Sequence, residues 1–111
     1  MDFKDIQHLA YKGYREKGFL EKWEKARKIL REHGLERIVD LAELGLVVTE
    51  IAEAMEEIRD DNSKAESKEL AGVFIRLSNY SMRKGYNLES EIIRESRRNL
   101  TRPKLHRRKV M

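Results

Sequence analysis

Three glutamates have side chains and a spacing that could support chemistry. Glu50 and Glu53 lie three residues apart in an apolar helical run, 41–60, and Glu69 opens the next run, 68–81. Carboxylates spaced i, i+3 project from one helix face about one turn apart. Two such faces brought together concentrate negative charge, which is costly unless a cation neutralises it. Because Mg²⁺ prefers hard oxygen ligands and often binds beside phosphates, the pattern favours phosphate chemistry with Mg²⁺.

Length and composition limit the possible classes of protein. The chain has 111 residues, enough for one domain, with 40% charged and 40% hydrophobic residues. No apolar stretch approaches the length of a transmembrane helix, and the N-terminus lacks the apolar region of a secretory signal. The absence of cysteine excludes disulfides and thiolate metal sites. These features predict a cytoplasmic protein without membrane partners.

Positive charge is concentrated at the C-terminal end. The net charge is +4, but residues 94–111 hold eight Lys and Arg against one acid, Glu95. The preceding residues are therefore net acidic, and an acidic body with a basic tail could hold a metal in one part and phosphates in the other. We predict one domain over 1–100 and a basic tail over 101–111.

Local signals predict an all-α fold of four or five helices. Alternating strand patterns and hairpin turns are almost absent, and the single proline is Pro103. Glycines at 18, 34 and 85 mark helix ends. Ser63, with Ser67 as a rival, and Asn87 are candidate caps. The expected helices cover about 3–17, 21–33, 36–60, 63–84 and 88–99.

The third and fourth helices each carry an apolar stripe. Residues at helical spacing share one face, and such stripes are usually core. Because the stripes are long for so short a chain, we expect a partner subunit to cover part of them. The stripe residues are Leu44, Val47, Val48, Ile51, Met55 and Ile58 on the third helix and Leu70, Val73, Phe74, Leu77 and Tyr80 on the fourth.

Four segments together resemble the MazG-like family of all-α nucleoside triphosphate pyrophosphohydrolases. TEIAEAMEEIRD (49–60) followed by ELAGVFIRL (69–77) resembles the family's E-x-x-E and E-x-x-D motifs on successive helices. NLTRPKLH (99–106) resembles its N-x-T-R-P-x-x-H segment, and Gly18-Phe19 its G-F after the first helix. E-x-x-E alone is weak, but the ordered set spans about residues 3–108. The resemblance implies a MazG-like helical bundle completed by oligomerisation, as a homodimer or homotetramer.

The resemblance also implies an activity. The family hydrolyses a nucleoside triphosphate to a monophosphate and pyrophosphate. Glu50, Glu53 and Glu69 would be the catalytic carboxylates and the ligands of Mg²⁺, with Mn²⁺ as an alternative ion. One carboxylate would accept the proton of the attacking water. The residues that would bind the substrate are Asn99, Arg102, Lys104 and His106.

The chain departs from the family pattern within its functional segments. Gly72 stands where the second motif has Asp, which removes a fourth carboxylate and should weaken or abolish turnover. Asn79 replaces a frequent Asp, Glu95 a usual Lys, and Arg107 a common Gly. Since the core stripes remain intact, the pattern indicates either a relative whose catalysis is lost or altered, or a deliberately altered chain. Glu56, Glu57 or another subunit could supply the missing ligand.

Ordinary alternatives exist for each functional assignment. Glu50 and Glu53 could be surface acids paired with Arg59 or Arg76, and Glu69 an acid in a helix's first turn. Tyr14 and Trp23 could stack on a base, but their helical spacing favours core positions. The basic tail could contact a nucleic-acid backbone, but it lacks interleaved aromatics and a recognition motif, so nucleic acid is not the expected partner. The non-enzyme alternative is a helical-bundle binding or oligomerisation protein, with nucleotide or nucleic-acid phosphate contact through the basic tail.

Overall fold

The predicted all-α fold is confirmed in the part of the chain that the structure describes. The structure is a computed structural model that describes residues 1–103. These residues form five helices and no strand. Their bounds lie within a few residues of those predicted. The helices are α1 (Phe3–Glu16), α2 (Phe19–Arg31), α3 (Arg37–Arg59), α4 (Ser63–Lys84) and α5 (Leu88–Thr101).

Caps and left-handed glycines explain where the helices begin and end. Gly18, Gly34 and Gly85 have φ values of +82°, +70° and +75°, a region that non-glycine residues rarely adopt. The predicted Asn87 cap is confirmed, because its side chain accepts a hydrogen bond from Ser90 N. The predicted serine cap of the fourth helix is wrong: the preceding Asn62 accepts from Ala65 N at 3.2 Å.

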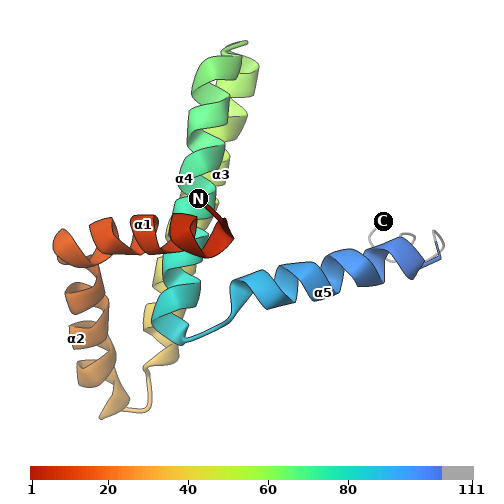
Figure 1. Cartoon of the computed structure of the whole chain (residues 1–111). Coiled ribbons are helices and arrows are strands. Elements are labelled where there is room, and N and C mark those ends of the chain that lie inside the picture. Colours follow the sequence, from red (N-terminus) through yellow and green to blue (C-terminus); the bar gives the residue numbers. More distant parts are fainter. Residues whose placement is uncertain (104–111) are drawn as a thin grey trace.

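The two longest helices, α3 and α4, form an antiparallel hairpin that organises the chain. Figure 1 shows α1 crossing this hairpin and α2 turning back beside it. Where α1 meets α4, Phe3 packs edge-on against Phe74 with ring centroids 5.7 Å apart. Nearby, buried Gln7 donates a hydrogen bond to Ser78 Oγ at 3.0 Å. The free end of the hairpin, where α3 leads into α4, extends beyond α1 and α2 (Figure 1).

The last helix, α5, is separate from this assembly. It leaves the hairpin after Gly85 and points away from it (Figure 1). An ion pair between Lys4 and Glu89, at 3.7 Å, connects its first turn to α1. Within residues 1–103, no helix is long and apolar enough to cross a membrane.

The core of the single chain is small and lies along the α3–α4 contact. The buried apolar residues of the described chain are Tyr14, Val39, Val47 and Ala54. Within one chain, the predicted core position is therefore confirmed for only part of the α3 stripe. Val47 is buried and Leu44 half-buried, but the rest of the stripe is exposed. Those exposed residues are Val48, Ile51, Met55 and Ile58.

Candidate functional site

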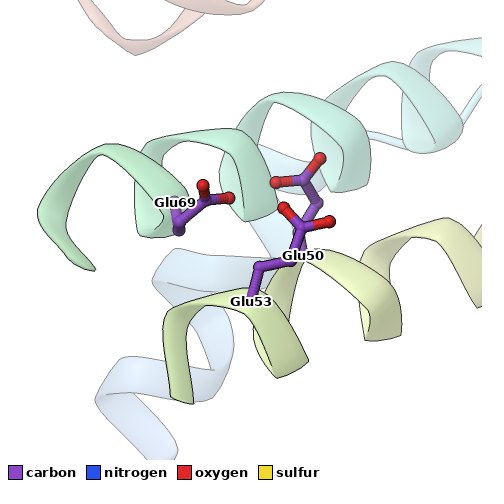
Figure 2. Close-up of side chains that lie close together, drawn as sticks. All are labelled: Glu50, Glu53 and Glu69. Carbon is purple, nitrogen blue, oxygen red and sulfur yellow. The ribbon is translucent and has the colours of Figure 1, made fainter. Parts of the chain in front are cut away.

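The three glutamates singled out in the sequence converge between α3 and α4. Glu50 and Glu53 share one face of α3, and Glu69 faces them from the first half of antiparallel α4 (Figure 2). One carboxylate oxygen from each lies within 4.8 Å of the others. Glu53 is exposed, whereas Glu50 and Glu69 are half-buried. We call this set the acidic triad. Its oxygens form a hard donor set of the kind that Mg²⁺ prefers.

The crowding of the three acids raises the pKa of one of them, Glu69. Hydrogen bonding with Glu53 and then with Glu50 raises the pKa of Glu69 from its ordinary 4.5 to about 7. Partial burial and repulsion from the two neighbouring carboxylates act in the same direction. Near neutral pH Glu69 is therefore only partly ionised, and the acidic triad carries less than three full negative charges. A divalent cation would compete with the proton on Glu69 for the same oxygens.

One carboxylate of the acidic triad already has a cationic partner. Arg76 Nε donates a hydrogen bond to Glu50 Oε1 at 2.8 Å, with 40% of the arginine side chain exposed. The alternative that pairs Glu50 with Arg76 is thus confirmed as a contact. Arg59 instead pairs with Glu56 at 3.2 Å, which leaves Glu53 to the triad.

Glycine at position 72 lets the Glu50 carboxylate lie against α4. A Cβ added there would be 2.7 Å from Glu50 Oε2, closer than real Cβ contacts allow. Glu50 therefore occupies space beside the position where the sequence motif would supply a fourth carboxylate. The obstructing atom is the end of a flexible side chain, so a larger residue at Gly72 requires Glu50 to move rather than the backbone.

A cavity of about 500 Å³ adjoins the acidic triad. The two sites share Glu50, and the cavity wall also includes Gly72 and Arg76. Its lining is mainly apolar, as is usual for pockets that bind small organic molecules. The remaining lining residues are Leu9, Ala10, Gly13, Tyr14, Lys17, Phe19, Trp23, Glu43, Leu46, Ile75 and Asn79.

Aromatic residues of α1 and α2 form part of the cavity wall. Tyr14 is buried, which confirms its predicted core position, and its ring stacks on Phe19 with centroids 6.3 Å apart. Trp23 is half-buried and lines the same space. Sequence spacing indicated only that these residues face inward, because the cavity depends on how α1 and α2 pack against the hairpin.

Asn79 is an unsatisfied polar residue in the cavity wall. It is 5% exposed, and its Oδ1 has no hydrogen-bond partner within the described residues. A buried acceptor without a partner costs about 1–3 kcal/mol. Rotation of the amide exchanges its donor and acceptor, so the side chain can offer either to a ligand. The sequence marked this position only as a departure from the family pattern.

Sequence reasoning missed a second cluster of charges. It lies where α3 begins and α4 ends, at the other end of the hairpin from the α3–α4 connection. Arg83 Nε donates to Glu43 Oε1 at 2.7 Å, and another guanidinium nitrogen donates to Asp40 Oδ1 at 2.6 Å. Lys84 Nζ donates to Asp40 at 2.6 Å, and Tyr14 Oη donates to Glu43 at 2.6 Å. We call these five residues the Arg83 network. The sequence signal for this network is a pair of acids near the start of α3 and a pair of bases at the end of α4. The signal can be interpreted only when the register of the hairpin is known.

Protonation in the Arg83 network is fixed by its hydrogen bonds. Burial alone lowers the pKa of Arg83, but bonds to Asp40 and Glu43 outweigh it, and the net shift is upward. Burial raises the pKa of Asp40, but bonds from Lys84 and Arg83 reverse this and hold it below its ordinary value. Burial and the bond to Glu43 raise the pKa of Tyr14. These groups keep their usual charges at neutral pH.

The predicted substrate residues are not brought to the acidic triad within one chain. Asn99 and Arg102 lie at the far end of α5, which points away from the hairpin (Figure 1). There Arg102 donates to Asn99 Oδ1 at 3.4 Å. Lys104 and His106 lie outside the described residues. The substrate-binding role of all four residues stays a prediction.

Comparison with protein-family models, curated proteins and solved structures finds no match for this chain. The MazG-like assignment therefore depends on the motifs in this sequence alone. Three of its four motif carboxylates are present, and the structure brings those three together.

Proposed function

We propose that this chain is a Mg²⁺-dependent nucleoside triphosphate pyrophosphohydrolase with weakened catalysis. The observation that carries the proposal is the acidic triad beside a mainly apolar cavity with which it shares Glu50. A nucleoside triphosphate is both a polyanion and a flat organic group, so its two parts match these two adjacent environments. The order of motifs along the chain adds independent support.

In the proposed reaction, the water oxygen forms a bond to one phosphorus atom of the α–β phosphoanhydride, and the bond from that phosphorus to the bridging oxygen breaks. The products are a nucleoside monophosphate and pyrophosphate. Glu50, Glu53 and Glu69 would hold the cation, which would supply positive charge to the phosphates and a polarised water. A carboxylate of the acidic triad takes the water's proton. Arg76, which borders the cavity, is suited to exchange part of its bond with Glu50 for a phosphate oxygen. The nucleoside occupies the cavity between the hairpin and the aromatic residues of α1 and α2.

Two features explain why catalysis should be weakened. Gly72 supplies no carboxylate, so the cation has three acidic ligands rather than the family's four. In addition, Arg76 neutralises part of the charge on Glu50. Both changes lower the attraction for Mg²⁺, and slow turnover or a need for high Mg²⁺ concentration follows.

A non-catalytic helical-bundle binding protein is the second candidate. The Glu50–Arg76 pair favours it, because a paired carboxylate is a weaker metal ligand. Under this alternative the acidic triad is a solvated acidic surface, and the cavity binds a ligand without hydrolysing it. This alternative predicts that neither Mg²⁺ nor nucleoside triphosphates change the protein's thermal stability.

The test is pyrophosphate release from a panel of ribo- and deoxynucleoside triphosphates with Mg²⁺, Mn²⁺ or EDTA. Glu53→Ala should abolish any metal-dependent release, because Glu53 belongs to the acidic triad and has no cationic partner in the described residues. Glu56→Ala is the matched control, one turn along the same helix. Glu56 pairs with Arg59 and does not belong to the acidic triad, so the structure does not favour it as the missing ligand. Equal release by the parent protein and Glu53→Ala would place the metal elsewhere. No release from any nucleotide would favour the binding protein.

A further inference from the structure

One buried polar side chain in the described chain lacks a hydrogen-bond partner, and it lies in the cavity wall. Five polar or charged residues are buried within residues 1–103, and four of them take part in side-chain hydrogen bonds. The four are Gln7, Glu43, Ser78 and Ser81. The fifth is Asn79, whose Oδ1 has no partner. Because folded proteins pair nearly all buried polar groups, this exception points to a donor supplied from the cavity.

A second buried polar residue of the cavity wall, Glu43, lies at the same level of the hairpin as Asn79. Glu50 of α3 lies against Gly72 of α4, which fixes the register of the two antiparallel helices. Glu43 precedes Glu50 by two helical turns, and Asn79 follows Gly72 by two turns. Both residues are therefore displaced from the level of Glu50 in the same direction, by about 10 Å along the hairpin.

The polar groups at this level of the wall accept hydrogen bonds rather than donate them. Glu43 accepts one bond at each oxygen, from Arg83 and from Tyr14, and each oxygen has capacity for a second. Tyr14 uses its only hydroxyl hydrogen in that bond. Asn79 could present its NH₂ group after a half-turn of the amide, but the Glu43 carboxylate has no hydrogen to offer. A ligand that carries hydrogen-bond donors therefore matches this part of the wall.

The remaining wall suits the faces of a flat ring. The rings of Tyr14 and Phe19 stack with centroids 6.3 Å apart, and the half-buried Trp23 lines the same cavity. Aromatic side chains bind the face of a heterocycle, and the polar groups then meet its edge. The separation of about 10 Å between the level of Glu50 and that of Glu43 leaves room for a ribose between the phosphates and the base.

We propose that the cavity selects nucleobases with an exocyclic amino group, whose two hydrogens are accepted by Glu43 and Asn79. Adenine, cytosine and guanine carry this group. Uracil, thymine and hypoxanthine lack it, and they offer a single ring N–H beside a carbonyl oxygen that would face the carboxylate without a hydrogen between them. A site built to bind a donor discriminates strongly against an analogue that lacks it. The inference rests on the proposed function for placing a nucleoside in the cavity, and it adds the class of base.

Calorimetric titration of the full chain with matched nucleoside monophosphates in EDTA tests the proposal. The pairs are cytidine with uridine monophosphate and adenosine with inosine monophosphate, since the members of each pair differ by an amino group in place of a carbonyl oxygen. The amino member should bind at least about tenfold more tightly in both pairs. The fluorescence of Trp23, the only tryptophan, should change with the same midpoint because Trp23 lines the cavity. Equal binding within the pairs, tighter binding of the carbonyl members, or no binding of all four would overturn the proposal.

A variant of Asn79 separates a binding role from a structural one. Asn79→Leu keeps the size of the side chain and removes an unpaired buried acceptor, so the melting temperature should not fall while the preference for amino members decreases severalfold. Ser78→Ala is the control, because Ser78 is buried next to Asn79, accepts a hydrogen bond from Gln7 and lies outside the cavity wall. It should lower the melting temperature and leave the preference unchanged. An unchanged preference in Asn79→Leu would overturn the role of Asn79.

The titrations need neither metal nor hydrolysis, so the inference and the proposed function can fail separately. A preference for amino members in a protein that releases no pyrophosphate would support the inference and contradict the proposed function. Equal binding within the pairs, together with Mg²⁺-dependent pyrophosphate release, would overturn the inference and leave the proposed function in place.

Discussion

The same two helices carry two clusters of acids, and they differ in how their charge is balanced. In the Arg83 network, Asp40 and Glu43 face Arg83 and Lys84, and every carboxylate has a bond of 2.7 Å or less to a cation. The side chains of Arg83 and Glu43 are only 2% and 5% exposed. In the acidic triad, Arg76 pairs with Glu50, and its side chain is partly exposed; no ion pair joins Glu53 or Glu69 to a cation within residues 1–103.

The difference is consistent with a structural role for the Arg83 network and with the role proposed for the acidic triad. Buried charges are tolerated where partners neutralise them, and the Arg83 network meets this condition within the chain. The acidic triad does not, and its repulsion raises the pKa of Glu69 to about 7, so that this carboxylate is partly protonated near neutral pH. A cluster that keeps excess negative charge at an accessible position beside a cavity is suited to bind a cation with a phosphate ligand.

Replacing the arginine of each cluster should have the largest effect on stability, and the two losses should differ strongly. Arg83→Met leaves Glu43 buried without its charged partner and should lower the free energy of unfolding by about 3–5 kcal/mol. Arg76→Met removes a partly exposed pair and should cost less than about 1 kcal/mol. Urea unfolding at one fixed protein concentration measures both. Equal losses would show that the two clusters play the same structural role.

Substitution of Gly72 should sharpen the functional side of the comparison. Gly72→Asp adds a fourth carboxylate and should tighten Mg²⁺ binding by about tenfold, equivalent to about 1.4 kcal/mol. Gly72→Ala is the matched control, because its Cβ also displaces the Glu50 carboxylate but brings no ligand. Titration calorimetry with Mg²⁺ and pyrophosphate release measure both variants. If the two variants behave alike, the missing-ligand explanation is wrong.

The two clusters should respond to pH in opposite directions, a smaller effect. The pKa of Glu69 is raised from 4.5 to about 7 on folding, so in EDTA its contribution to stability is present below 4.5 and lost as pH rises to about 7. The pKa of Asp40 is lowered, so its contribution is present above 3.8 and lost in acid. Urea unfolding between pH 3 and pH 8 measures both slopes.

Two isosteric variants identify the groups responsible for these slopes. Glu69→Gln should flatten the decline between pH 4.5 and 7, whereas Asp40→Asn should flatten the loss in acid. Glu66→Gln, a first-turn acid of α4 outside both clusters, should change neither slope. A decline that persists in Glu69→Gln would show that the acidic triad is not its source.

Sequence patterns predicted the helices well because their signals are local. Glycines at 18 and 85 and the Asn87 cap act within one turn, so helix ends could be located to within a few residues. The convergence of Glu50, Glu53 and Glu69 could also be predicted, since it needs only two adjacent antiparallel helices. The Asn62 cap was missed because neighbouring serines offered competing patterns.

Features that depend on three-dimensional packing could not be predicted. The stripe containing Val48 and Ile51 has the period of a core face, but periodicity does not say whether the chain itself or another subunit covers it. The Arg83 network required the register of α3 against α4, which no local signal gives. Asn99 and Arg102 were assigned to the site by motif, but the direction of α5 within one chain separates them from it.

The most direct test of the central claim is calorimetric titration of the metal-free protein with Mg²⁺ at pH 7. Comparison of the binding enthalpy in two buffers of different ionisation enthalpy gives the number of protons released on binding. We predict Mg²⁺ binding that releases a fraction of a proton, because Glu69 with a pKa of about 7 is partly protonated there. Binding should disappear in Glu53→Gln and remain in Glu56→Gln. The absence of binding, or binding that is unchanged in Glu53→Gln, would contradict a cation-binding role for the acidic triad.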